Sequence, residues 1–198
     1  MEFLEFAHAW EILAREGVVT LSGEEPLSDD HLQLDYDESQ PAWRMMFGMR
    51  EGFEPDINNV ETLASPRDRA GEVLTHILHK LHISPVFLFP IGVWRDVFDV
   101  ATTSLLENPE WMELDTASTV KLNKRDPLRV ELRDLATVQS LIDALLANAI
   151  ALKQGISIAA IAAPLLFEID SDGGVLVTAG SENLATEIKM ITEALTRK

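Results

Sequence analysis

The sequence predicts an α+β fold, with a mainly helical N-terminal part followed by a ββαββα unit. In this unit two hairpins form one antiparallel sheet of about four strands, and both helices pack on the same face. The main observation is a pattern that occurs twice, over residues 119–149 and 165–195: an extended hairpin and then an amphipathic helix. The second observation is that helical periodicity dominates the chain before residue 112. We expect one domain over 1–198, with a division into 1–112 and 113–198 as the alternative.

The N-terminal part is predicted from helix signals and from short apolar runs. Residues 3–16 carry apolar residues at three- and four-residue spacing, and Gly17 is a natural stop. Ser65 and Pro66 form a good helix start, as N-cap and first helical residue, for a helix that ends near His82. The other elements predicted here are a helix over 91–107 and strands over 18–21 and 85–90.

The first predicted hairpin runs from Thr119 to Leu132. Apolar and polar residues alternate on both of its arms, which is the period of a half-buried strand. The turn, residues 123–127, reads Asn-Lys-Arg-Asp-Pro. The apolar face would carry Val120, Leu122, Leu128, Val130 and Leu132. Further along, residues 155–163 are ambiguous, because 156–158 favour a strand and 159–163 favour a short helix.

The second predicted hairpin, residues 165–179, has Asp-Gly between two apolar arms. This is a strong hairpin signal, because glycine adopts positive φ without steric cost. A three-residue loop over 171–173 places four apolar residues on one face, whereas a two-residue loop breaks the match. These four residues are Phe167, Ile169, Val175 and Val177.

Each hairpin leads into a helix with a suitable N-cap, Asp134 in the first case and Ser181 or Asn183 in the second. Both helices carry an apolar stripe at three- and four-residue spacing. Asp-Leu-Ala-Thr at 134–137 also aligns with Asn-Leu-Ala-Thr at 183–186. The alignment suggests an internal repeat, although leucine and alanine are common in any helix.

Composition limits the classes of function. The chain has 16 basic and 33 acidic residues, for a net charge of -17. Such a surface repels phosphate backbones and anionic lipid, so we expect neither nucleic-acid nor membrane binding. It suits a basic protein partner, and the simpler alternative is that the charge serves solubility or a saline habitat.

The cellular location is predicted from the termini, the apolar runs and the cysteine count. The start of the chain, residues 1–5, is acidic and lacks the pattern of a signal peptide. The most apolar run, 156–167, is too short to span a bilayer. There is no cysteine, which excludes disulfides and thiolate metal sites and fits a reducing compartment. We therefore expect a cytoplasmic protein.

The candidate partner-binding segment lies at residues 41–49. It concentrates methionine and aromatic residues between acidic flanks, and exposed surfaces of this kind suit adaptable binding. The alternative is that the segment packs into the core, as most apolar side chains do. The candidate binding residues are Trp43, Met45, Met46, Phe47 and Met49.

The candidate metal site is Glu72, His76 and His79, which share one face of the helix predicted from residue 65. A carboxylate and two imidazoles are suitable ligands for a divalent metal. The opposite face of this helix is apolar, so the alternative is a solvated face with adventitious metal binding. We predict no other cofactor. Asp170 to Gly173 lacks the further ligands of a calcium loop, and Asp-Gly is better explained as a hairpin turn.

Two functional hypotheses follow. The first is a non-enzymatic protein-binding protein, such as an adaptor, chaperone or inhibitor. It agrees with the acidic surface and with the absence from the sequence of phosphate-binding, dinucleotide-binding and nucleophile motifs. The second is a small-molecule-binding protein or metal-dependent enzyme with a pocket between the helical part and the sheet. A free edge of the predicted sheet would also favour a two-fold homodimer.

Overall fold

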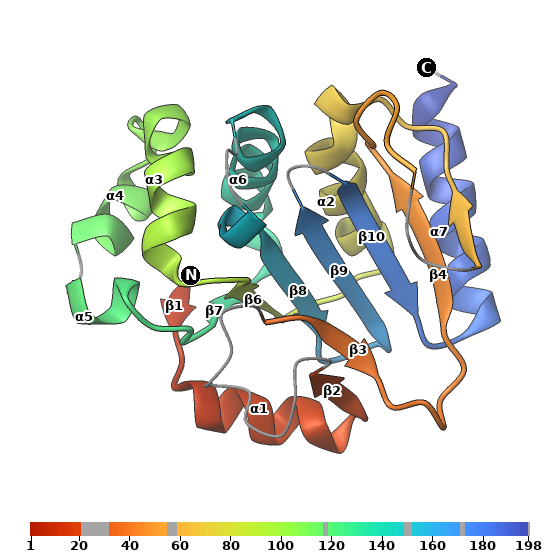
Figure 1. Cartoon of the computed structure of the whole chain (residues 1–198), viewed down its shortest axis with the longest axis horizontal. Helices are drawn as coiled ribbons and strands as arrows, with labels where there is room; N and C mark the ends of the chain where they lie inside the picture. Colours follow the sequence, from red (N-terminus) through yellow and green to blue (C-terminus); the bar gives the residue numbers. More distant parts are fainter. Residues whose placement is uncertain (21–31, 55–58, 117–118, 149–151, 171–172, 198) are drawn as a thin grey trace.

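A computed structural model describes residues 1–20, 32–54, 59–116, 119–148, 152–170 and 173–197. Its centre is a mixed sheet of eight strands in the order β1-β7-β6-β8-β9-β10-β4-β5 (Figure 1). Neighbouring strands are antiparallel except β4 and β5, which are parallel. In sheet order the strands are β1 (Glu2–Phe3), β7 (Leu128–Val130), β6 (Val86–Pro90), β8 (Ile156–Ala160), β9 (Leu165–Asp170), β10 (Gly174–Ala179), β4 (Trp43–Phe47) and β5 (Val60–Thr62).

One face of the sheet is covered by four helices, which lie side by side in Figure 1. They are α2 (Ala70–Lys80), α3 (Trp94–Leu105), α6 (Leu135–Asn148) and α7 (Glu182–Thr196). Two short helices lie in the connections, α4 (Pro109–Thr116) and α5 (Thr119–Leu122). The connections also contain 3-10 turns at Arg67–Arg69, Leu132–Asp134 and Leu152–Gln154. The main hydrophobic core lies between the four helices and the sheet.

The other face is partly covered by α1 (Phe6–Arg15) and by a small separate sheet of β2 (Val18–Thr20) and β3 (Leu34–Tyr36). A second hydrophobic cluster lies under this layer. Strand β6 serves both clusters, because Val86 and Leu88 face the four helices while Phe87 and Phe89 face α1. A strand buried on both faces reads as a continuous apolar run, and this is how residues 85–90 were predicted.

Two local predictions are confirmed. The second hairpin pairs Asp170 with Gly174, which leaves the predicted three residues between the strands. Gly174 has a φ of 119°, a conformation that side-chain-bearing residues rarely adopt. The helix that follows is capped by Ser181, whose Oγ accepts from the Leu184 N–H at 3.3 Å.

The predicted fold class is wrong in two respects. The sheet has eight strands rather than about four, and residues before 112 contribute half of them, β1, β4, β5 and β6. The N-terminal part is therefore not mainly helical. The error arose because β4 lies in a methionine-rich run without a strand period, and β5 has only three residues. Strands this short are fixed by their pairing partners and not by their own sequence.

The first predicted hairpin is also wrong. Residues 119–122 form the short helix α5, which contacts α3 and α4, and β7 pairs instead with β1 and β6. Alternation over four residues is too short to distinguish a strand from one helical turn. The supposed repeat therefore lacks a hairpin in its first copy. Residues 155–163 were ambiguous between a strand and a short helix, and the structure has the strand, since β8 extends to Ala160. In the described part of the chain no helix is both long and apolar enough to cross a membrane.

Candidate functional site

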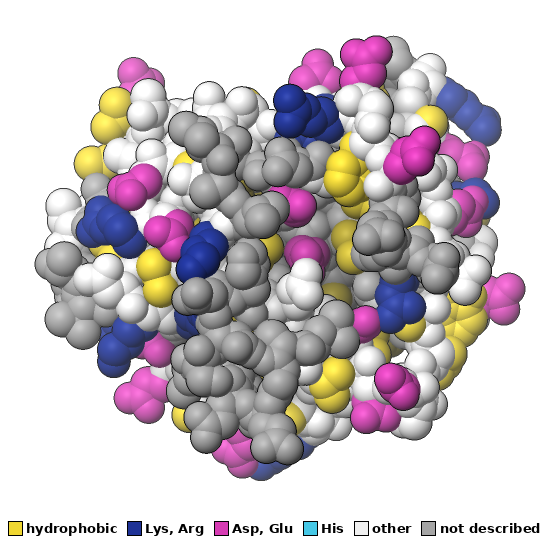
Figure 2. Space-filling view, viewed as in Figure 1, with side chains coloured by type: hydrophobic (Ala, Val, Ile, Leu, Met, Phe, Trp, Pro, Cys, Tyr) yellow, Lys and Arg dark blue, Asp and Glu magenta, His cyan; other side chains and the backbone are white. Residues whose placement is uncertain are grey.

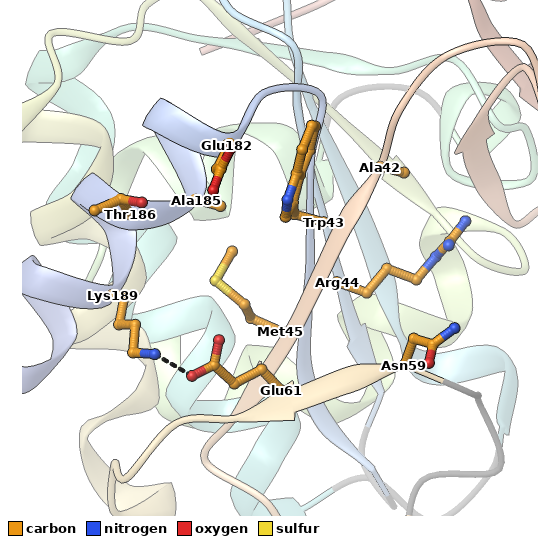
Figure 3. A pocket seen from close by; sticks show the side chains of 10 residues that line it. All are labelled: Ala42, Trp43, Arg44, Met45, Asn59, Glu61, Glu182, Ala185, Thr186 and Lys189. Carbon is orange, nitrogen blue, oxygen red and sulfur yellow. Dashed lines mark hydrogen bonds and ion pairs between the residues drawn. The ribbon is translucent and has the colours of Figure 1, made fainter.

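The candidate site is a cleft of about 370 Å³ between strands β4 and β5 and helix α7 (Figure 3). It lies at the end of the sheet where β5 is the last strand. Strand β4 supplies one wall and the floor, the start of α7 supplies the facing wall, and β5 closes one side. The position follows from the fold, because α7 returns along the sheet directly after the β9–β10 hairpin.

The β4 wall is built by alternation along the strand. Trp43 and Met45 point toward α7, while Arg44 points away from them (Figure 3). Met45 is 2% exposed and belongs to the main core, so it forms the floor. Trp43 is half-buried and leaves part of its ring accessible in the cleft. A tryptophan held in this way offers a large contact area at small entropic cost.

The facing wall and the closed side carry charge. Lys189 on α7 forms an ion pair with Glu61 on β5, which joins the two elements across the cleft (Figure 3). The hydrogen bond to Glu61 and its negative charge raise the pKa of Lys189. The raised pKa favours the protonated, cationic form of Lys189. Glu182 and Thr186, from the first turns of α7, add exposed oxygen atoms above this pair.

Arg44 links strand β4 of the cleft to strand β3, which lies on the other face of the main sheet. Its Nη2 lies 2.6 Å from Oδ2 of Asp35 on β3, and both side chains are at least partly buried. The two cations lining the cleft, Arg44 and Lys189, thus each have a carboxylate partner. This arrangement suits the binding of a ligand that has both apolar and polar groups.

The structure separates the residues of the predicted partner-binding segment. Met45, Met46 and Phe47 are buried in strand β4, while Trp43 and Met49 are half-buried. The segment therefore does not form the continuous exposed patch that the first hypothesis expected. Trp43 and Met45 are the members of the segment that line the cleft.

The predicted metal ligands lie on α2, but their side chains have different surroundings. Both Oε atoms of Glu72 accept from Arg69, with Nε to Oε2 at 2.8 Å. His79 is exposed and its ring centroid lies 6.4 Å from that of His82, while His76 lines a shallow groove beside α7. Among the described residues, no group of three or more histidine or acidic side chains is placed to hold a metal ion.

Several residues of the cleft had no signal in the sequence. Glu61 and Lys189 are 128 positions apart, and strand β5 was not predicted. Glu182 and Lys189 could have been grouped, since both lie on the polar side of a predicted helix. Which strand they would face depended on the sheet order, and no local pattern contains that information.

Comparison of the chain with protein-family models, with curated proteins and with solved structures finds no match. The proposals below therefore depend on the geometry of the described residues alone.

Proposed function

We propose that this protein is a non-enzymatic binding protein that takes an extended segment of a partner protein at the edge of its main sheet. The segment would lie along β5 and place one side chain in the cleft beside Trp43. The single observation that carries the proposal is a half-buried tryptophan in a cleft directly beside an open sheet edge.

The edge supports the proposal through its backbone groups. In a parallel pair, alternate residues of the edge strand turn their N–H and C=O groups toward the partner strand. The Leu63 N–H donates to Met46 O at 2.7 Å, and Glu61 is opposite Met45. Val60 and Thr62 therefore turn their backbone groups outward, where no strand within the described ranges pairs with them. A peptide can add to such an edge as a further strand.

The cleft supports the proposal through its lining. Tryptophan is enriched among the residues that dominate binding energy. It contributes most when it lies in a concave site that excludes water. The carboxylates of Glu61 and Glu182 border this surface. Because the whole chain carries a charge of -17, a segment with lysine or arginine is attracted and an acidic segment is repelled.

A second candidate function is the binding of a small molecule in the same cleft. Its volume of about 370 Å³ favours this, because small-molecule sites begin at about 300 Å³. The two functions differ in their need for the β5 edge. A small molecule would use the cleft alone, whereas a peptide also needs the outward backbone groups of Val60 and Thr62.

Selection from a display library of random short peptides tests the proposal. We expect enriched peptides to contain an apolar residue next to a basic one, and Trp43→Ala to lower their affinity by about 10-fold or more. Trp10→Ala is the matched control, since Trp10 is also half-buried but lies on α1. Peptides that bind Trp43→Ala as tightly as the wild type would refute the assignment to this cleft.

A fragment screen distinguishes small-molecule binding, the second candidate function, from peptide binding. Fluorine-labelled tryptophan reports on Trp43, and the Trp43→Phe variant assigns its resonance. Fragments that shift this resonance, in a protein that enriches no peptide, would favour small-molecule binding over the peptide proposal.

A further inference from the structure

The strongest unassigned feature lies on the sheet face covered by α1, where a buried hydroxyl has no partner. Ser157 on β8 is 1% exposed, and its Oγ makes no hydrogen bond within the described part of the chain. Buried polar groups are normally paired, and leaving one unpaired costs about 1–3 kcal/mol. A bound water or ion is the usual explanation for such a group.

The hydroxyl lies beside a half-buried carboxylate. Ser157 is directly opposite Glu168 in the β8–β9 register, and alternation puts both side chains on the α1 face. Burial, helped by the nearby negative charges of Asp170 and Asp35, raises the pKa of Glu168 to about 7. Gln33 hydrogen-bonds this carboxyl and opposes the rise. Acidic side chains are visible at the centre of this face in Figure 2.

The charged groups that raise the pKa of Glu168 are both carboxylates, Asp170 and Asp35. Strand β9 contributes Glu168 and Asp170, β3 contributes Asp35, and β4 contributes Arg44, which is paired with Asp35. Helix α1 presents the apolar residues Phe6, Ala9 and Leu13 to this layer. A cation near Ser157 and Glu168 would therefore meet a favourable field in a partly desolvated place.

We propose that Ser157 Oγ and the Glu168 carboxylate together bind a small monovalent cation, either an alkali ion or ammonium. A hydroxyl and a carboxylate are oxygen ligands that suit such an ion. Calcium and magnesium sites usually contain several carboxylates, and no group of three acidic or histidine side chains within the described ranges could hold such an ion. Because the cation competes with a proton for Glu168, its affinity rises with pH.

The test is the pKa of Glu168 in the full chain, measured by NMR of the carboxyl carbon of labelled glutamate. The salts are KCl, NaCl and ammonium chloride, each compared with tetramethylammonium chloride at equal ionic strength. Tetramethylammonium screens charge equally, but its methyl groups keep its charge out of direct contact with oxygen ligands. We expect at least one of the small ions to lower the pKa by about 1 pH unit relative to tetramethylammonium. The salt that lowers the pKa shows whether the bound cation is an alkali ion or ammonium.

Two serine variants locate the effect. In Ser157→Ala the pKa of Glu168 stays raised, but the difference between salts is lost. In Ser140→Ala the difference remains, because the Ser140 Oγ is exposed on α6 and donates to Ala136 O. An equal pKa in all four salts would mean that water fills the site and would overturn the proposal. A difference that persists in Ser157→Ala would overturn it too, by placing the ion elsewhere.

Discussion

At the scale of single residues, the surroundings of a side chain influence its burial and pKa more than its residue type does. The chain has 33 acidic residues, and Glu168 differs from most of them because the sheet and the α1 layer enclose it. Its neighbours in the strand, Phe167 and Ile169, are buried on the helix side. A polar position between buried ones predicts an exposed side chain, but here the second face of the sheet is covered as well.

Glu168 makes a specific contribution to the pH dependence of stability. Its pKa is about 7 in the folded chain and near 4.5 when unfolded, so the folded state holds its proton longer. The free energy of unfolding therefore falls as pH rises from about 4.5 to 7, by roughly 3 kcal/mol from this group. We expect Glu168→Gln to remove most of this fall, measured by urea unfolding at about pH 5 and about pH 8.

The control for this measurement is Glu187→Gln, an exposed position on α7. It should keep the pH dependence of the wild type. If Glu168→Gln and the wild type lose the same stability between the two pH values, the Glu168 carboxyl has an ordinary pKa. That result would contradict its enclosure between the sheet and the α1 layer.

Trp111 illustrates a second residue-scale effect. Its ring stacks on Phe98 with centroids 4.1 Å apart, yet its buried Nε1 has no partner among the described residues. We expect Trp111→Phe to cost less than about 1.5 kcal/mol, because stacking remains and the unpaired N–H is removed. Trp111→Ala should cost about 3–5 kcal/mol through the cavity that it leaves. Urea unfolding of both variants checks this, and equal costs would contradict it.

At the scale of elements, the short strand β5 matters most for the proposed function. It has three residues, borders the cleft, and pairs only with β4 in the part of the chain that the structure describes. Short edge strands limit unwanted pairing between molecules, which suits an edge that selects one kind of partner. The ion pair between Glu61 on β5 and Lys189 on α7 joins these two elements across the cleft.

Proline substitution distinguishes the two sides of β5. Thr62→Pro removes an outward N–H and should leave stability within about 1 kcal/mol of the wild type, because edge strands tolerate proline there. We expect it to abolish binding of the selected peptides. Glu61→Pro removes an inward N–H and should destabilise the fold clearly. Circular dichroism melts and peptide titrations measure both effects, and full peptide binding by Thr62→Pro would exclude strand addition.

At the scale of the whole molecule, the net charge affects the stability of the fold. The chain folds with a net charge of -17, so self-repulsion opposes the compact state. Screening by salt should therefore raise the melting temperature. The measurement is best made in tetramethylammonium chloride, which screens repulsion without entering the cation site proposed at Ser157. A melting temperature that falls with this salt would show that attractive ion pairs outweigh the repulsion.

The sequence alone was sufficient for the elements whose pattern is long and local. The hairpin over 165–179, the buried strand within 85–90 and the helix after Ser181 agree with the structure. Their side-chain periods extend over five or more residues and end at clear turn or capping residues. The unusual composition around Trp43 had singled out this residue, which lines the candidate cleft.

Tertiary structure alone decided the sheet order and the composition of both sites. Strand β6 pairs with β8, and β4 pairs with β10, although in neither pair are the two strands consecutive along the chain. The pairing partners of Trp43 and the contacts of Lys189 follow from that order. Local periodicity records which side of an element is buried, whereas the identity of the covering element is set by contacts between distant parts of the chain. For this reason the apolar run of β6 indicated a strand buried on both faces, but no residue pattern indicated that Ser157 and Glu168 share the second covered face.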